Sequence, residues 1–187
     1  MMKVAFLILF FCSSLIVGST IKNLSLNYQE IDVCDLLKNI SGNIGFIINN
    51  SKEIVFQQQD NCILELIDSL ENEVNISNNK LFLIALDSLC NYSDGYLSEY
   101  FDEVFPNLFY NNFNTLMIYL YHNRNSQIEE FLIWGLSLEV NMSEDKSLKK
   151  NEIIDFVRTQ FENQSYTKEQ INYINDTVNK IDSSIWD

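Results

Sequence analysis

The chain has 187 residues, of which 47% are apolar and 13% aromatic, and it contains one proline and five glycines. A turn-rich β-sandwich or barrel needs a turn signal every ~8 to 12 residues, so this composition argues against both folds. The net charge is −14, and the most acidic stretch, Glu53 to Glu103, has eleven carboxylates and one base, which excludes nucleic acid and anionic lipid surfaces as partners of that stretch on Coulombic grounds.

The first 20 residues have the pattern of a cleaved export signal. Lys3 precedes an apolar stretch from Val4 to Val17, and Val17-Gly18-Ser19-Thr20 offers small residues at the minus-three and minus-one positions of signal peptidase. We therefore expect an exported protein, periplasmic or secreted, with 21–187 as its mature chain. No later segment supplies the roughly 20 apolar residues of a transmembrane helix, so no span is expected after cleavage.

The mature chain is long enough for one domain with a sizeable core. Apolar residues recur along it at helical spacing. We expect an all-α fold, a compact array of about seven or eight mostly antiparallel helices, in which stacked helix pairs are possible. No fixed period with matching residues recurs, so the sequence does not predict a named repeat.

The first half of the mature chain contains four helical segments. Apolar positions from Ile31 to Ile40 fit one helix face, and Gly42 is expected to end that helix. Segment 44–56 fits either a short hairpin or two helical pieces, and we favour the helices. A clean stripe predicts a helix over Asp60–Val74. The strongly apolar helix Lys80–Cys90 is expected at the centre of the fold.

The next three helices are predicted from their start signals and spacing. Asp94 begins a helix that Pro106 must end or kink, since proline lacks the backbone N–H and clashes one turn back. Another helix covers 113–121. Ser126 and Glu129, three residues apart, predict a capping box at the start of the helix that follows.

The last part of the chain begins with a polar stretch. Residues 141–147 predict a linker, and apolar positions over 153–161 predict a helix after it. Thr167 and Gln170 form a second predicted capping box, which opens a final helix through Ile181. We expect all of these helices to belong to a single domain, 21–187.

The acidity of the chain is concentrated between Glu53 and Glu103, where there are eleven carboxylates and one base, Lys80. Such a surface favours a basic protein or peptide as partner. The plainer interpretation is a solvated acidic face that keeps an exported protein soluble. The densest acidic group, and our candidate binding patch, is Asp94, Glu99, Asp102 and Glu103.

Two of these carboxylates suggest a second function. Glu99 and Asp102 lie three residues apart and share one helix face. Such a pair fits the acid and nucleophile of a glycosidase. The acidic surface leads us to expect a non-enzymatic interaction module. The carboxylate pair supports the alternative, a small extracytoplasmic hydrolase of carbohydrate.

Cysteine and histidine do not suggest a metal site. Cys34, Cys62 and Cys90 are 28 residues apart each time, and the single histidine is His122. Zinc sites use close ligand pairs, so no metal is expected. In an oxidising compartment we expect one disulfide, Cys34–Cys62 or Cys62–Cys90, and one buried thiol.

Catalytic side chains and phosphate loops are also missing from the sequence pattern. His122 lies at a helix end, where it more often satisfies the last carbonyls than acts as a base. No Gly-x-Ser-x-Gly turn presents a nucleophile, and no glycine-rich loop is present to hold a nucleotide. We expect no catalytic triad and no cofactor.

Asn-x-Ser/Thr triplets are more frequent than composition predicts. The excess indicates either glycosylation in a eukaryotic secretory pathway or a coding bias that places capping serines after helix-ending asparagines, and we favour the bias. The eight triplets begin at Asn23, Asn39, Asn49, Asn75, Asn91, Asn141, Asn163 and Asn175.

Overall fold

The computed structural model describes residues 31–57 and 60–185, and within them all regular secondary structure is helical. The all-α prediction is confirmed. The helices are α1 (Val33–Leu36), the 3-10 helix η1 (Leu37–Asn39), α2 (Ile40–Asn49), α3 (Ser51–Val55), α4 (Asp60–Ser77), α5 (Lys80–Cys90), α6 (Gly95–Asn111), α7 (Phe113–His122), α8 (Gln127–Met142), α9 (Lys146–Asn163) and α10 (Lys168–Asn179).

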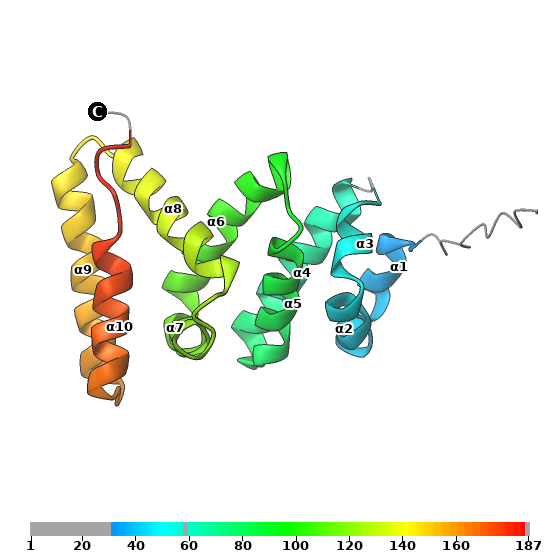
Figure 1. Ribbon diagram of the computed structural model, residues 1–187. Helices are drawn as coiled ribbons and strands as arrows, with labels where there is room; N and C mark the ends of the chain where they lie inside the picture. The colour runs from blue at the N-terminus through cyan, green and yellow to red at the C-terminus, as the bar shows by residue number, and fades with distance from the viewer. Residues whose placement is uncertain (1–30, 58–59, 186–187) are drawn as a thin grey trace, which may run out of the picture.

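The helices lie side by side in a row, with α1–α3 at one end and α9 and α10 at the other (Figure 1). Along this row α4 packs on α6 and α6 on α8, while α5 packs on α7 and α7 on α10. Several helices are therefore positioned by neighbours that are not adjacent in sequence. Within the described residues, none of the helices combines the length and apolarity needed to cross a lipid bilayer.

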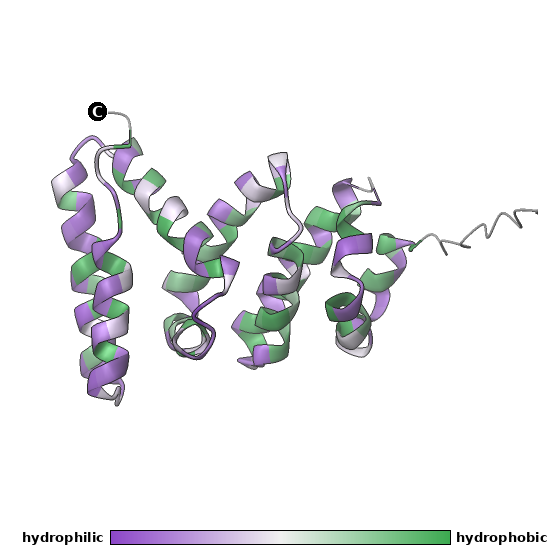
Figure 2. Cartoon of the chain, in the orientation of Figure 1, coloured by the Kyte–Doolittle hydropathy of each residue, from purple (hydrophilic) through white to green (hydrophobic). Residues whose placement is uncertain are grey.

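Helix α6 carries the aromatic centre of the core. Phe101, Phe105 and Phe109 follow one another at four-residue spacing and are fully buried. Their spacing places them on one helix face, because residues four apart lie one above the other. Phe131 of α8 packs 5.6 Å from Phe101, and Phe156 of α9 packs 5.4 Å from Phe109, measured between ring centroids. Figure 2 shows α9 and α10 as more hydrophilic than α4 and α5.

Pro106 lies inside α6 and does not end it. Because proline has no backbone N–H, the carbonyl of Asp102 lacks its usual partner one turn later. Helix α8 crosses α6 at this point through Gly135. A Cβ added to Gly135 would lie 2.1 Å from the Asp102 carbonyl oxygen and 2.6 Å from Pro106 Cγ. The crossing therefore requires glycine.

Two predicted boundaries are wrong. Helix α2 runs through Gly42, and the break falls earlier, where the Asn39 side chain accepts a hydrogen bond from the Gly42 N–H at 3.0 Å and caps α2. The predicted linker 141–147 shrinks to three residues, because α8 continues to Met142. Asn141 is polar yet buried, since its amide donates to the carbonyls of Ser137 and Asp182, both at 2.8 Å.

The two capping boxes have different outcomes. Thr167 and Gln170 form both reciprocal bonds at the start of α10, as predicted. Ser126 starts α8 by accepting a hydrogen bond from the Ile128 N–H at 3.2 Å, but Glu129 does not complete a box. Its carboxylate bonds to α10 instead.

A disulfide joins α1 to α4. Of the two pairings considered, the structure contains Cys34–Cys62, with Cα atoms 5.1 Å apart, while Cys90 is a free and buried thiol in α5. The expected export signal, residues 1–20, lies outside the described residues.

Gly135→Ala tests the α6–α8 crossing. We expect the free energy of unfolding to fall by about 1–3 kcal/mol, because the methyl group meets backbone and a proline ring that cannot move aside. Urea unfolding followed by far-UV circular dichroism measures the change. Gly45→Ala in α2 is the matched control: its added Cβ meets nothing within 4 Å, and a gain of about 0.5–1 kcal/mol is expected. Equal stability of Gly135→Ala and the wild type would contradict the conclusion that the α6–α8 crossing requires glycine at this position.

Candidate functional site

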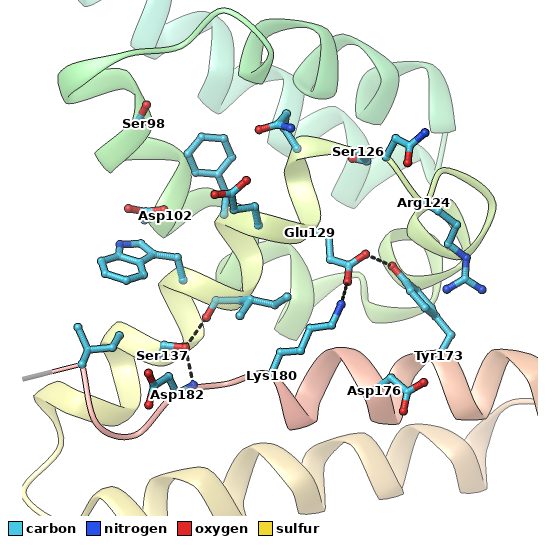
Figure 3. Close-up of a pocket in the computed structure, with 17 residues that line it drawn as sticks. Ser98, Asp102, Arg124, Ser126, Glu129, Ser137, Tyr173, Asp176, Lys180 and Asp182 are labelled. Atoms are coloured by element: carbon cyan, nitrogen blue, oxygen red, sulfur yellow. Dashed lines mark hydrogen bonds and ion pairs between the residues drawn. The ribbon is translucent and has the colours of Figure 1, made fainter.

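A groove of about 1190 Å³ lies between α6, α8 and α10 (Figure 3). Each helix contributes one face to it, as helical spacing requires. The lining residues include Ser98 and Asp102 of α6, Glu129, Glu130, Ile133, Trp134 and Ser137 of α8, Tyr173, Asp176 and Lys180 of α10, Arg124 of the loop before α8, and Asp182 and Ile185 of the C-terminal tail.

The groove is acidic. Five carboxylates line it against two cations, Arg124 and Lys180. Both cations already have partners within the chain. Lys180 Nζ lies 2.6 Å from Glu129 Oε1, and the Arg124 guanidinium stacks 3.7 Å above the ring centroid of Tyr173. The remaining carboxylates therefore give the groove a negative potential.

Glu129 is the hub of the α8–α10 contact. The Tyr173 hydroxyl donates to its Oε2 at 2.7 Å while Lys180 pairs with the other oxygen, as Figure 3 shows. Burial, followed by the hydrogen bond to Glu129, raises the pKa of the Tyr173 hydroxyl well above its usual value. The Tyr173 hydroxyl therefore stays protonated and donates a hydrogen bond to this carboxylate.

The C-terminal tail is held along the groove by α8. The buried Ser137 hydroxyl donates to the Ile133 carbonyl at 2.6 Å and accepts from the Asp182 N–H at 2.9 Å (Figure 3). Lys150 of α9 donates to the Ile181 carbonyl at 2.7 Å. These bonds fix the tail residues that follow α10 as part of the groove wall.

At the α6–α8 crossing, a carboxylate and an indole line the same groove. Asp102 Oδ1 is buried without a hydrogen-bond partner. Burial, and then the charges of Glu99 and Glu103, raises the pKa of Asp102 to about 6. Trp134, which is 46% exposed, directly precedes Gly135 on α8, and Gly135 contacts the Asp102 backbone.

Of the four carboxylates of the predicted acidic patch, Asp102 lines the groove. Glu99 and Glu103 are close enough to raise its pKa but do not line the groove. Asp94 precedes α6 as its N-cap residue and makes no capping bond with its side chain. Glu99 and Asp102 therefore do not both face the groove as a carboxylate pair.

Part of the acidic stretch is used between α4 and α6. Tyr96 of α6 donates to Asp60 at 2.8 Å, and Tyr100 donates to Asp68. Burial, followed by the charge of Asp68, raises the pKa of Glu71 on α4 to about 7. Asp60 and Asp68 therefore contribute to the contact between α4 and α6 while remaining exposed.

The sequence did not single out Trp134, Glu130 or Asp176. Glu130 and Trp134 are four residues apart on α8, a spacing that predicts a shared face but gives no reason to choose it. His122, the last residue of α7, is exposed and does not line the groove. Among the described residues, no group of three or more His, Cys, Asp or Glu side chains is arranged to hold a metal ion.

Comparison with known proteins gives no relative from which a function could be transferred. No family model matches the chain, and no curated protein or solved structure matches it. The assignment of function therefore depends on the groove.

Asp102→Asn tests the partly buried carboxylate by the pH dependence of stability. Between the ordinary value of 3.8 and about 6, the folded chain binds more protons at Asp102 than the unfolded chain does. This group therefore lowers the free energy of unfolding as the pH rises through that window. We expect the stability of Asp102→Asn relative to the wild type to rise over the same window, measured by thermal unfolding at a series of pH values.

Glu65→Gln is the control for this pH series, because it makes the same chemical change on the exposed side of α4. A difference between Asp102→Asn and the wild type that stays constant with pH would contradict a buried, destabilised carboxylate at this position.

Proposed function

We propose that the protein is an exported, non-enzymatic interaction module that binds a basic segment of another protein. The observation that carries this proposal is the groove between α6, α8 and α10. It presents carboxylates beside the exposed indole of Trp134, and its own cations are already engaged. Aromatic rings and carboxylates together are suited to cationic side chains.

The charge of the whole chain supports the same partner. At −14, its field attracts a basic protein before contact, which raises the association rate. The groove then adds short-range contacts that a diffuse charge lacks. The Cys34–Cys62 disulfide and the N-terminal signal pattern support an oxidising, extracytoplasmic location, periplasmic or secreted.

Binding of a defined polycation tests this proposal. The mature chain, 21–187, is expected to bind poly-L-lysine at low salt and to lose at least about tenfold in affinity at high salt, because salt screens exposed charges. Isothermal titration calorimetry measures both affinities, with poly-L-glutamate as the negative probe. Failure to bind poly-L-lysine at low salt would refute the proposal.

Variants separate local from overall charge in this experiment. Replacement of Glu99, Asp102 and Glu103 by serine is expected to weaken binding several-fold, since these carboxylates lie in or beside the groove. The control replaces three exposed carboxylates away from the groove and leaves the same net charge. These are Glu144, Glu152 and Glu162.

Hydrolysis of extracellular carbohydrate is the second candidate. The raised pKa of Asp102 is the observation that favours it, because a protonated carboxyl near neutral pH is suited to a general acid. Glu130 and Asp176 line the same groove and are the candidates for the second carboxylate. On this function, Asp102→Asn abolishes release of reducing sugar from cell-wall polysaccharide, whereas an inactive wild type excludes it for that substrate.

A further inference from the structure

The α10 half of the groove is formed by Arg124, Glu129, Tyr173 and Lys180, and it contains two cations of the chain with their partners. Arg124 lies 3.7 Å above the Tyr173 ring centroid and 4.5 Å above that of Tyr121. Lys180 pairs with Glu129, which also accepts the Tyr173 hydroxyl bond. Aromatic rings bind one cation and a carboxylate binds the other, and both cations come from the chain itself.

The α6 half offers the same two kinds of group. Trp134 supplies an aromatic surface that is 46% exposed, and Asp102 supplies a carboxylate with one buried, unpartnered oxygen. No ion pair in the described parts of the chain involves Asp102. Glu130, four residues before Trp134 on α8, adds a second negative charge to this half of the groove.

We infer that this α6 half, formed by Asp102 and Trp134, is the binding site for an arginine side chain of the partner segment. The inference rests on the proposed function and specifies the chemistry of its partner. Charge complementarity selects a cation, because the groove carries five carboxylates against two internally engaged cations.

Arginine fits this half better than lysine does. A planar guanidinium stacks on an indole face and donates a charge-assisted hydrogen bond to a carboxylate, whereas an ammonium is a strongly hydrated point charge. A guanidinium beside Asp102 also favours the ionised carboxylate, which burial and the neighbouring carboxylates disfavour in the free protein.

Fluorescence of Trp134 gives a direct readout of this site. The chain contains two tryptophans, so Trp186→Phe in the mature chain leaves Trp134 as the single indole. The probes are three pentapeptides with a central arginine, lysine or citrulline between glycines. Citrulline keeps the shape of arginine without its charge.

The arginine peptide is expected to change Trp134 emission with saturation. The lysine peptide should bind at least about threefold more weakly, and the citrulline peptide should give no saturable change. Asp102→Asn should weaken arginine binding at least about tenfold, because the charge-assisted contact is lost. If that variant does not fold, Glu130→Gln replaces it, with an expected loss of at least about twofold from removal of one groove charge.

Glu162→Gln is the matched control, since it removes an exposed carboxylate of α9 that does not line the groove. Equal weakening by Asp102→Asn and Glu162→Gln, or equal binding of the arginine and citrulline peptides, would overturn the inference. The proposed function would survive either result if poly-L-lysine still bound. Loss of poly-L-lysine binding as well would remove both.

Discussion

The close crossing of α6 and α8 is the contact on which the groove depends. Pro106 removes one backbone donor from α6, and Gly135 lets α8 approach the carbonyl that this leaves without its helical partner. Helices with side chains at such a contact stand 8–10 Å apart, and a glycine permits a closer approach. Trp134 directly precedes Gly135, the residue that contacts the Asp102 backbone. The helix crossing therefore also brings Trp134 and Asp102 into the lining of one groove.

Acidic residues of this protein fall into two groups that the sequence does not separate. In one group, tyrosine hydroxyls from a neighbouring helix donate to the carboxylate, which connects adjacent members of the row. The pairs are Tyr96–Asp60, Tyr100–Asp68, Tyr110–Glu139, Tyr119–Asp87 and Tyr173–Glu129. The other group, represented by Asp102, has no such donor. Carboxylates of the first group therefore contribute to contacts between helices as well as to the net charge.

The helices were predictable because apolar residues at helical spacing mark the buried face, as the stripe in α4 from Ile63 to Val74 shows. Boundaries were less predictable where tertiary contacts compete with local signals. Glu129 gives up its predicted capping role to bind α10, and Asn141 is polar but buried between α8 and the tail. The groove itself combines α6, α8, α10 and the tail, which no local pattern relates. The raised pKa of Asp102 comes mainly from burial, which depends on the packing of the folded chain and not on the local sequence pattern.

Electrostatics connects the instability of Asp102 with recognition. A carboxylate whose pKa is raised by burial and by neighbouring charges makes the folded chain less stable near neutral pH than an uncharged side chain would. A bound cation would relieve both causes, since it compensates the desolvation and opposes Glu99 and Glu103. Internal cations provide this compensation for Glu129 but not for Asp102 within the described residues. Glu129 has a cation of the chain as its partner and Asp102 has none among the described residues. This difference is the physical basis for assigning the α6 half to a partner.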